Sequence, residues 1–506
     1  MRPRIRRRRR SLAASRPLGG RIVHVGLVLA LAFGSLAVGA GYWAVARADE
    51  LASSPDDAAV IAAARDTARG RILDRDGRVL ASNRRTDDGE AYRVYADPAI
   101  SHVVGYASRR YGSVGLERTY AAELLGVRPQ DPVARLAAKF RPAEDARADL
   151  RTSLSLPLQR LAVRLLGEDR GAVVMLDPRT GEVLVLASTP TFDASAVADP
   201  ASSERTFPRL REDSSKPLLP RATQGRYVPG SVFKIVTAVA GLGSGAVTPS
   251  THFPRQPPAE EDGLLVSGYH VRDGHHPATG DRALDLGGAI EVSCNIWFAL
   301  AGLETGGAEL TGWAERLGFD APLPFDLPTV ESQLTNGGGP LPGGFADDVE
   351  LANAAYGQGE VLVTPLQMAL IAASIANDGV LMEPHLATAF IDRAGSERTV
   401  APRAWRTILD PSANEAIRAG MERAVEGVLG RQFTAGARVP GIRVAGKSGT
   451  AELGGRGEPH SWFIGFAPAD DPEVVIAVLV ERGGSGAQRA SPLAGKMLRA
   501  YFESPR

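Results

Sequence analysis

The chain has 506 residues and balances 58 basic against 58 acidic side chains, so its formal net charge is zero. Its single cysteine excludes an internal disulfide, and stability must therefore come from packing. A chain of this length is too large for one hydrophobic core, and we expect at least two domains.

The amino terminus indicates a membrane anchor. Residues 1–21 contain nine arginines and no acidic residue, and the 25 residues from 22 to 46 contain no Asp, Glu, Lys or Arg. Such a span is long enough to cross a bilayer as a helix. Because basic flanks stay in the cytoplasm, we expect a cytoplasmic tail (1–21), a single transmembrane helix (22–46) and an extracytoplasmic body held at the cytoplasmic membrane.

Two other interpretations of this segment are weaker. A signal peptide could be cleaved after Ala46 or Ala48, but its apolar core would be about twice the usual length. An arginine run can bind nucleic acid, but without these nine arginines the chain has 49 basic and 58 acidic residues, a net charge of −9. We therefore expect an uncleaved anchor and no nucleic-acid partner.

The body divides into two predicted parts. Residues 47–155 mix charged stretches with a strand-like segment (71–81) and a helix-like one (117–125), which predicts a non-catalytic pedestal domain. From residue 156 to 506 we expect a second domain. The pattern predicts hairpins at 172–187 and 462–481, a mostly helical stretch from about 231 to 430 and a final helix over 492–502. An antiparallel sheet flanked by helices and a helical lobe is an α+β arrangement, with a cleft between sheet and lobe.

Ser231-Val232-Phe233-Lys234 begins the helical stretch. Only five of the 58 basic residues are lysines, and an amine can lose its proton in a protein whereas a guanidinium cannot. The apolar run over 235–242 predicts a buried helix, and burial lowers the pKa of Lys234. One helical turn separates the two side chains, so a neutral Lys234 could activate Ser231 for acyl transfer. The alternative is a solvated helix face, since Ser-x-x-Lys is a loose pattern.

Two further motifs follow in order. Ser293-Cys294-Asn295 precedes an apolar stretch and would otherwise be an ordinary helix N-cap, and Lys447-Ser448-Gly449-Thr450 continues a strand-like segment. These three motif types occur together in class A β-lactamases and penicillin-binding proteins. The chain resembles the class B (monofunctional) penicillin-binding proteins, which are serine D,D-transpeptidases of peptidoglycan synthesis. The resemblance covers nearly the whole chain and extends to residues 69–81, 115–120, 356–359, 364–369 and 460–468.

The resemblance implies a catalytic set. Ser231 would attack the D-Ala-D-Ala end of a stem peptide, with Lys234 as its base. Ser293 would pass a proton between Lys234, Lys447 and the departing amine. Asn295 would hold the substrate amide and anchor Lys234. Cys294 occupies the variable middle position of the second motif and does not affect this expectation.

The third motif would bind the substrate. The resemblance implies that Lys447, Ser448 and Thr450 hold the terminal carboxylate of the donor, and that Gly449 permits close backbone approach. The backbone N–H groups of Ser231 and Thr450 would stabilise the oxyanion. An acceptor amine then takes the acyl group and forms a cross-link, and β-lactams acylate the same serine. No cofactor is expected.

The resemblance also implies partners and leaves alternatives. A membrane glycan polymerase of the SEDS family is an expected partner, in cell division or in the maintenance of cell shape. A D,D-carboxypeptidase or a β-lactamase differs only in what attacks the acyl-enzyme. A β-lactam-sensing membrane receptor would need a cytoplasmic effector, for which 21 residues leave no room.

Other candidate sites are weaker. His270, His275 and His276 lie near Asp273 but lack the usual ligand spacing, so we expect no metal. The glycine-rich residues 336–340 lack the lysine of a phosphate loop and predict a mobile loop near the cleft. His460 precedes an apolar strand, and we expect a packed or cleft-lining residue rather than an essential base.

Overall fold

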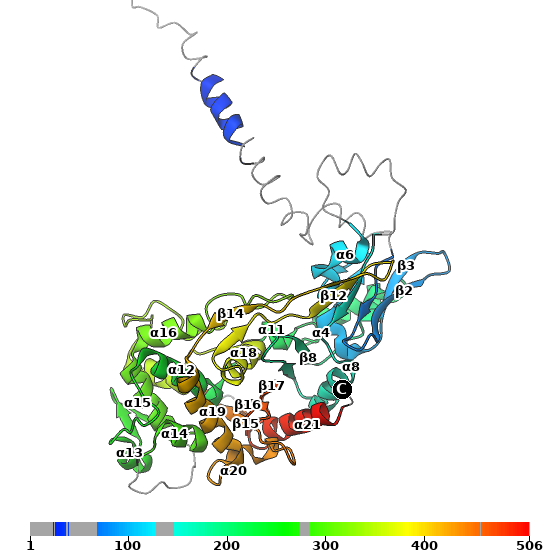
Figure 1. Cartoon of the computed structure of the whole chain (residues 1–506). Helices are drawn as coiled ribbons and strands as arrows, with labels where there is room; N and C mark the ends of the chain where they lie inside the picture. The colour runs from blue at the N-terminus through cyan, green and yellow to red at the C-terminus, as the bar shows by residue number, and fades with distance from the viewer. Residues whose placement is uncertain are drawn as a thin grey trace, which may run out of the picture. The chain divides into compact units, whose positions relative to one another are not determined.

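The computed structural model describes residues 24, 26–36, 39, 68–127, 146–273, 283–455 and 457–504. Residues 58–127 and 145–506 form one compact unit, which Figure 1 shows together with the rest of the chain. A six-stranded sheet, a five-stranded sheet, three two-stranded sheets and a helical lobe make up the described part of this unit.

The predicted membrane helix, 22–46, lies partly outside the described residues. Residues 26–36 are helical, and their large apolar side chains, such as Leu31 and Phe33, are exposed. Among the residues that the structure describes, no helix has the length and apolar character needed to span a bilayer. The anchor therefore stays a prediction.

The amino-terminal sheet has six strands in the order β13-β12-β6-β1-β2-β3. Their bounds are β1 Ile72–Leu73, β2 Val79–Arg85, β3 Ala91–Tyr95, β6 Asp149–Thr152, β12 Ala387–Ile391 and β13 Glu397–Thr399. The strand expected over 71–81 is a hairpin instead, because Gly77 adopts a left-handed conformation (φ 81°) and reverses the chain between β1 and β2. Strands β12 and β13 come from far beyond residue 155, and the domain boundary placed there stays a prediction.

A buried ion-pair network holds this part together. The helix expected over 117–125 is two short helices, α5 (Leu116–Thr119) and α6 (Ala121–Leu125). Glu117 at the start of α5 is fully buried and binds Arg69 Nη1 at 3.1 Å and Arg93 Nε at 2.6 Å. Both arginines are at most 5% exposed, so the carboxylate neutralises charges that have lost their water.

The central sheet has five antiparallel strands in the order β15-β16-β17-β7-β8. Their bounds are β7 Gly171–Leu176, β8 Val183–Thr189, β15 Ala445–Ala451, β16 His460–Ala467 and β17 Val474–Val480. The two predicted hairpins and the antiparallel sheet are thereby confirmed. The final helix is also confirmed as α21 (Ala490–Glu503), which covers one face of the sheet together with α8 (Leu156–Leu166).

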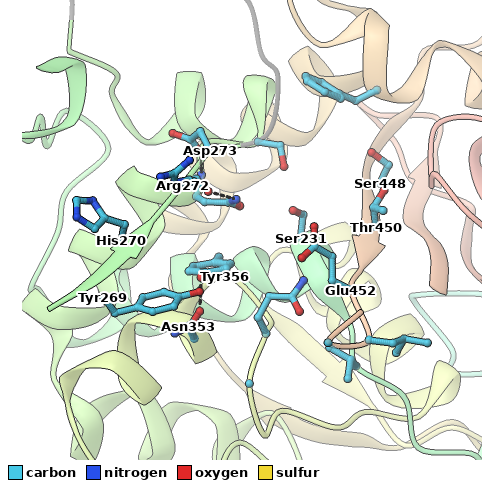
Figure 2. A pocket seen from close by; sticks show the side chains of 18 of the residues that line it. Ser231, Tyr269, His270, Arg272, Asp273, Asn353, Tyr356, Ser448, Thr450 and Glu452 are labelled. Carbon is cyan, nitrogen blue, oxygen red and sulfur yellow. Dashed lines mark hydrogen bonds between the residues drawn. The ribbon is translucent and has the colours of Figure 1, made fainter. Parts of the chain in front are cut away.

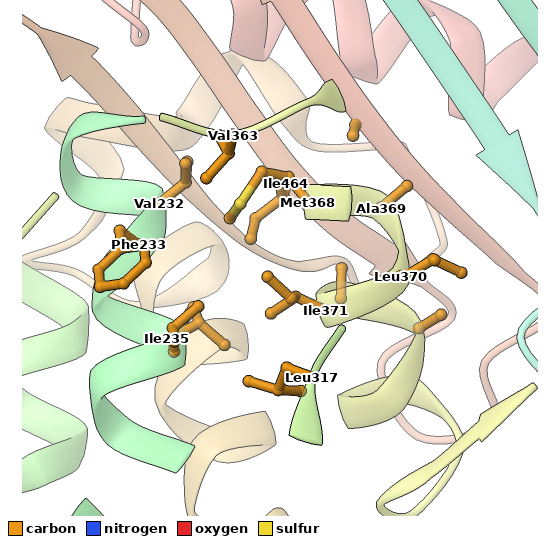
Figure 3. Packing of buried hydrophobic residues seen from close by; sticks show 14 of the residues in the cluster. Val232, Phe233, Ile235, Leu317, Val363, Met368, Ala369, Leu370, Ile371 and Ile464 are labelled. Carbon is orange, nitrogen blue, oxygen red and sulfur yellow. The ribbon is translucent and has the colours of Figure 1, made fainter. Parts of the chain in front are cut away.

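Helix α18 (Pro365–Ala376) covers the other face. Thr364 caps its amino terminus by accepting a hydrogen bond from Gln367 N at 3.1 Å, and every residue of the helix is buried. Figure 3 shows Met368 and Ile371 of α18 packed between Ile464 of β16 and the apolar side chains at the start of α12. The sheet and the helix that carries Lys234 therefore share one core.

The helical lobe is built from the middle of the chain (Figure 1). Its helices are α12 Lys234–Ser244, α13 Gln256–Asp262, α14 Leu286–Val292, α15 Asn295–Thr305, α16 Gly307–Arg316, α17 Asp348–Ala355, α19 Pro411–Glu426 and α20 Arg431–Thr434. The stretch expected to be mostly helical is interrupted by the hairpin of β9 (Leu264–Val266) and β10 (Tyr269–Val271). It is interrupted again by β11 (Val380–Met382), β12, β13 and β14 (Ala404–Thr407). β15 is the edge strand of the central sheet and contacts the lobe.

Candidate active site

Ser231 lies in a 3-10 turn, η2 (Gly230–Phe233), and the α-helix begins only at Lys234. Gly230 makes this turn with φ 58°, and its N–H donates to Gly357 O at 2.8 Å. A side chain at Gly230 would place Cβ 2.8 Å from the carbonyl oxygen of Thr450. Glycine is therefore required for the Ser231 turn to lie directly against β15.

The Lys234 amine joins the first two motifs. Its Nζ lies 3.1 Å from Ser231 Oγ, 3.1 Å from Ser293 Oγ, 2.5 Å from Ser293 O and 2.7 Å from Asn295 Oδ1. The side chain is fully buried, and burial lowers the pKa of Lys234 from 10.5 to about 8, although Asp273 and Cys294 oppose that shift. The predicted Ser231–Lys234 pair and the predicted anchoring of Lys234 by Asn295 are both present in the structure.

Ser293 occupies the junction between α14 and α15. It adopts a left-handed conformation (φ 62°, ψ 38°), which costs a non-glycine residue on the order of 1 kcal/mol. This conformation turns both the hydroxyl and the carbonyl of Ser293 toward Lys234. Cys294 of the same motif is the N-cap of α15, and its Sγ accepts from Trp297 N at 3.3 Å.

Strand β15 carries the third motif. Lys447 is 1% exposed, and its Nζ donates to Ser448 O at 3.1 Å. Burial and the charge of Lys234 hold the pKa of Lys447 well below its usual range. Burial is also the main cause of the lowered pKa of Lys234.

Gly449 is needed for packing within the protein. A Cβ at this position would lie 2.9 Å from Pro229 O and 3.2 Å from Trp462 Cβ. Glycine is therefore needed here because β15 lies directly against the turn that holds Ser231. Close approach of a substrate to Gly449 stays a prediction.

A cleft of about 1300 Å³ opens beside these residues. Five of the eight predicted site residues line it: Ser231, Ser293, Asn295, Ser448 and Thr450. Figure 2 shows Ser231 between β15 on one side and Tyr269 and Tyr356 on the other. The two lysines and Gly449 are buried next to the cleft.

Sequence reasoning missed the residues that orient Asn295. Its Nδ2 donates to Arg272 O at 2.9 Å, which leaves Oδ1 facing Lys234. Asp273 accepts hydrogen bonds from Asn295 N and, at 3.1 Å, from Cys294 Sγ. The sequence marks Asp273 only as a possible metal ligand, because no local pattern connects it to a helix that begins 22 residues later.

The cleft also has an aromatic wall that the sequence did not indicate. The Tyr356 hydroxyl donates to Asn353 Oδ1, and burial is the main reason that its pKa is raised. Tyr269 from β10 contacts Tyr356 and also lines the cleft. The segment 356–359 thus supplies both this wall and, through Gly357, the partner of Gly230.

The structure describes some of the weaker candidate residues, among them His460 and the glycine-rich loop, but not His275 and His276. His275 and His276 lie outside the described residues, and no three potential metal ligands cluster among the residues that the structure covers. His460 is half-buried, and its Nδ1 accepts from Arg482 N at 3.1 Å. Asn336 donates to Glu360 Oε2 at 2.7 Å, which places the glycine-rich loop beside a cleft-lining residue.

Comparisons with known proteins match both parts of the body. A family model described as the penicillin binding protein transpeptidase domain matches residues 171–501, and one described as the penicillin binding protein A dimerisation domain matches residues 69–147. A relative in Mycolicibacterium smegmatis, peptidoglycan D,D-transpeptidase PbpA, is 34% identical over 88% of this chain and 91% of its own length.

Solved structures are similar over the same extent. Penicillin-binding protein A from M. tuberculosis, in a ceftriaxone acyl-enzyme complex, superposes with a TM-score of 0.75 at 30% identity, over 88% of this chain and 100% of that chain. PBP2 of Pseudomonas aeruginosa, in complex with WCK 5153, has a TM-score of 0.72 at 28% identity, over 87% of this chain and 96% of that chain.

Proposed function

The chain belongs to the penicillin-binding protein transpeptidase family and is a peptidoglycan D,D-transpeptidase, and we propose that it works through an acyl-enzyme on Ser231. One observation carries this assignment. The buried Lys234 amine lies 3.1 Å from the hydroxyls of both Ser231 and Ser293. An amine with a pKa of about 8 exists partly in the neutral form near neutral pH, where it can accept a proton.

Acylation begins with proton transfer from Ser231 to Lys234. A neutral amine has two N–H bonds, and Ser293 O and Asn295 Oδ1 are acceptors that take them. The lone pair is then directed at the Ser231 hydroxyl. As the proton moves to Nζ, Ser231 Oγ attacks the carbonyl carbon between the last two residues of the stem peptide.

Ser293 completes the proton path. Its hydroxyl lies 3.1 Å from the protonated Lys234 amine and lines the cleft, so it can hand a proton to the nitrogen of the departing D-alanine. Lys447 lies close enough for the charge of Lys234 to lower its pKa.

We propose that β15 binds the donor. Ser448 and Thr450 face the cleft and would hydrogen-bond the terminal carboxylate of D-Ala-D-Ala, whose negative charge the protonated Lys447 amine would balance. The N–H groups of Ser231 and Thr450 would hold the oxyanion, because Gly230 brings the turn to within van der Waals contact of Thr450. Asn295 would hold the backbone amide of the peptide.

The acyl-enzyme then reacts with an amine of a second stem peptide, and an amide cross-link replaces the ester. A β-lactam enters the same route as a donor whose leaving group stays attached, so the Ser231 ester persists. The ceftriaxone acyl-enzyme complex of penicillin-binding protein A from M. tuberculosis is consistent with this chemistry.

The transfer reaction can be tested with a soluble D-Ala-D-Ala peptide and a peptide amine. Wild-type protein should release D-alanine and form the new amide, Ser231→Ala should do neither, and Ser244→Ala should behave as wild type because Ser244 ends the same helix away from the cleft. Release of D-alanine without any amide product would identify a D,D-carboxypeptidase instead.

We further propose that residues 22–46 anchor the enzyme in the cytoplasmic membrane, with residues 1–21 inside, residues 47–155 as a pedestal and the catalytic domain outside. The uncharged span and the nine preceding arginines support this topology. A SEDS-family glycan polymerase is the proposed partner, since new strands must be made where they are cross-linked. Protease added to spheroplasts should digest the body and leave a membrane-embedded fragment, whereas a soluble form beginning near residue 49 would contradict the anchor.

A further inference from the structure

Every second residue at the end of β15 faces the cleft. Ser448 and Thr450 line it, and so does Glu452, the residue after the strand ends at Ala451. Lys447 and Gly449 alternate with them and point into the protein, as side chains on a strand must. The row that starts with the proposed carboxylate-binding hydroxyls therefore ends in a carboxylate.

Glu452 differs from the other acidic residues of the cleft. Asp273 accepts hydrogen bonds at the start of α15, and Glu360 accepts one from Asn336. Glu452 is exposed, and within the described part of the chain no side chain or N–H group binds its carboxylate. Its negative charge nevertheless acts inside the cleft, because it contributes to the raised pKa of Tyr356 on the facing wall (Figure 2).

We propose that Glu452 binds the primary ammonium group of a stem peptide. The inference rests on the proposed function, in which Ser448 and Thr450 receive the carboxylate of the donor. Two residues of a strand span about 7 Å, so an extended peptide lying along this edge strand would meet a carboxylate-binding group and an ammonium-binding group in succession.

The reaction itself supplies such a group from two sources. The acceptor peptide must bring an amine, which is protonated in solution and must reach the Ser231 ester. The donor stem peptide carries the same side-chain amine, but this amine takes no part in the attack on the Ser231 ester. Arg272 and Arg482, which also line the cleft, would repel an ammonium group. The ammonium group of the peptide is therefore expected to bind at Glu452 rather than beside these arginines.

The size of the effect follows from the exposure of Glu452. An ion pair in contact with water changes binding by about two- to fivefold, and salt weakens it. The expected preference for a free amine over an acetylated amine is therefore modest, and it should shrink as the ionic strength rises.

The experiment compares two D-Ala-D-Ala donors, one with a free side-chain amine and one with that amine acetylated, on full-length wild type, Glu452→Gln and Glu360→Gln. If the donor amine binds Glu452, Glu452→Gln lowers the ratio of their acylation rates about two- to fivefold. If only the acceptor amine binds there, the ratio stays constant, and the acceptor concentration that half-saturates transfer from the acetylated donor rises by the same factor. Glu360→Gln should leave both quantities unchanged, because Glu360 already has a partner in Asn336.

A fluorescent penicillin without an amine separates the two possible failures. If Glu452→Gln is labelled by penicillin but changes neither the ratio of acylation rates nor the half-saturating acceptor concentration, only the inference about Glu452 is overturned. This result is expected if Glu452 pairs instead with an arginine of its own chain. If the fluorescent penicillin does not label the wild-type protein, the proposed function itself is overturned.

Discussion

The most informative perturbation is the exchange of Lys234 for arginine. Arginine keeps the positive charge and three or more donors for Ser293 O and Asn295 Oδ1, but it cannot give up a proton in a protein. If Lys234 only positioned Ser231 by hydrogen bonding, Lys234→Arg would retain part of the activity. If Lys234 is the base, the activity is lost.

The structure sets the scale of the effect. Lowering the pKa of Lys234 from 10.5 to about 8 raises the neutral fraction at pH 7 from roughly 0.03% to roughly 9%, about 300-fold or about 3 kcal/mol. The direction of the pH effect follows, because only the neutral amine accepts a proton. Acylation should rise about tenfold per pH unit below pH 8 and level off above it.

The assay is the rate of acylation by a chromogenic cephalosporin between pH 6 and 9.5, with folding checked by thermal unfolding. Lys234→Arg should be at least about a thousandfold slower at every pH. Lys496→Arg is the matched control and should retain the wild-type rate, because Lys496 is exposed on α21 and does not line the cleft. A rate that is flat across this range, or Lys234→Arg within a few-fold of wild type, would refute the assignment of Lys234 as the base.

Three further changes probe the surrounding structure. Glu117→Gln leaves two buried arginines without their counter-charge and should lower the free energy of unfolding by about 3–5 kcal/mol, measured in urea; a loss below 1 kcal/mol would contradict the network. Gly357→Ala would place Cβ 2.0 Å from the carbonyl oxygen of Gly230, next to Ser231, and should slow acylation about a hundredfold. Gly359→Ala is its control and should affect acylation far less, because its Cβ would meet nothing closer than 3.7 Å. Asp273→Asn removes a charge that raises the pKa of Lys234, so the midpoint of the acylation pH profile should move to lower pH; a move to higher pH would show that the coupling is wrong.

Much of the central sheet could be predicted because its signals are local. The hairpins β7–β8 and β16–β17 have apolar strands on both sides of short turns rich in proline, glycine and aspartate, and both strands and turns are visible in sequence. The site was predictable for a similar reason. Ser231 and Lys234 are one turn apart, and motif order identified their distant partners Ser293 and Lys447.

What could not be predicted depends on contacts between distant segments. Nothing near β12 indicates that it joins a sheet whose first strand, β1, lies more than 300 residues earlier, because a short strand acquires its partner only when the chain has folded. The orientation of Asn295 depends on the Arg272 carbonyl in the same way. Glu452 was missed because the strand row that exposes it becomes recognisable only when Ser448 and Thr450 are seen to face the cleft.

A single serine, Ser231, is proposed to carry the acyl group. The most direct measurement is mass spectrometric mapping of the protein after reaction with penicillin. We expect one penicilloyl adduct on the peptide that contains Ser231, and no adduct in a folded Ser231→Ala protein. An adduct on Ser293, Ser448 or any other residue of the wild-type protein would contradict it.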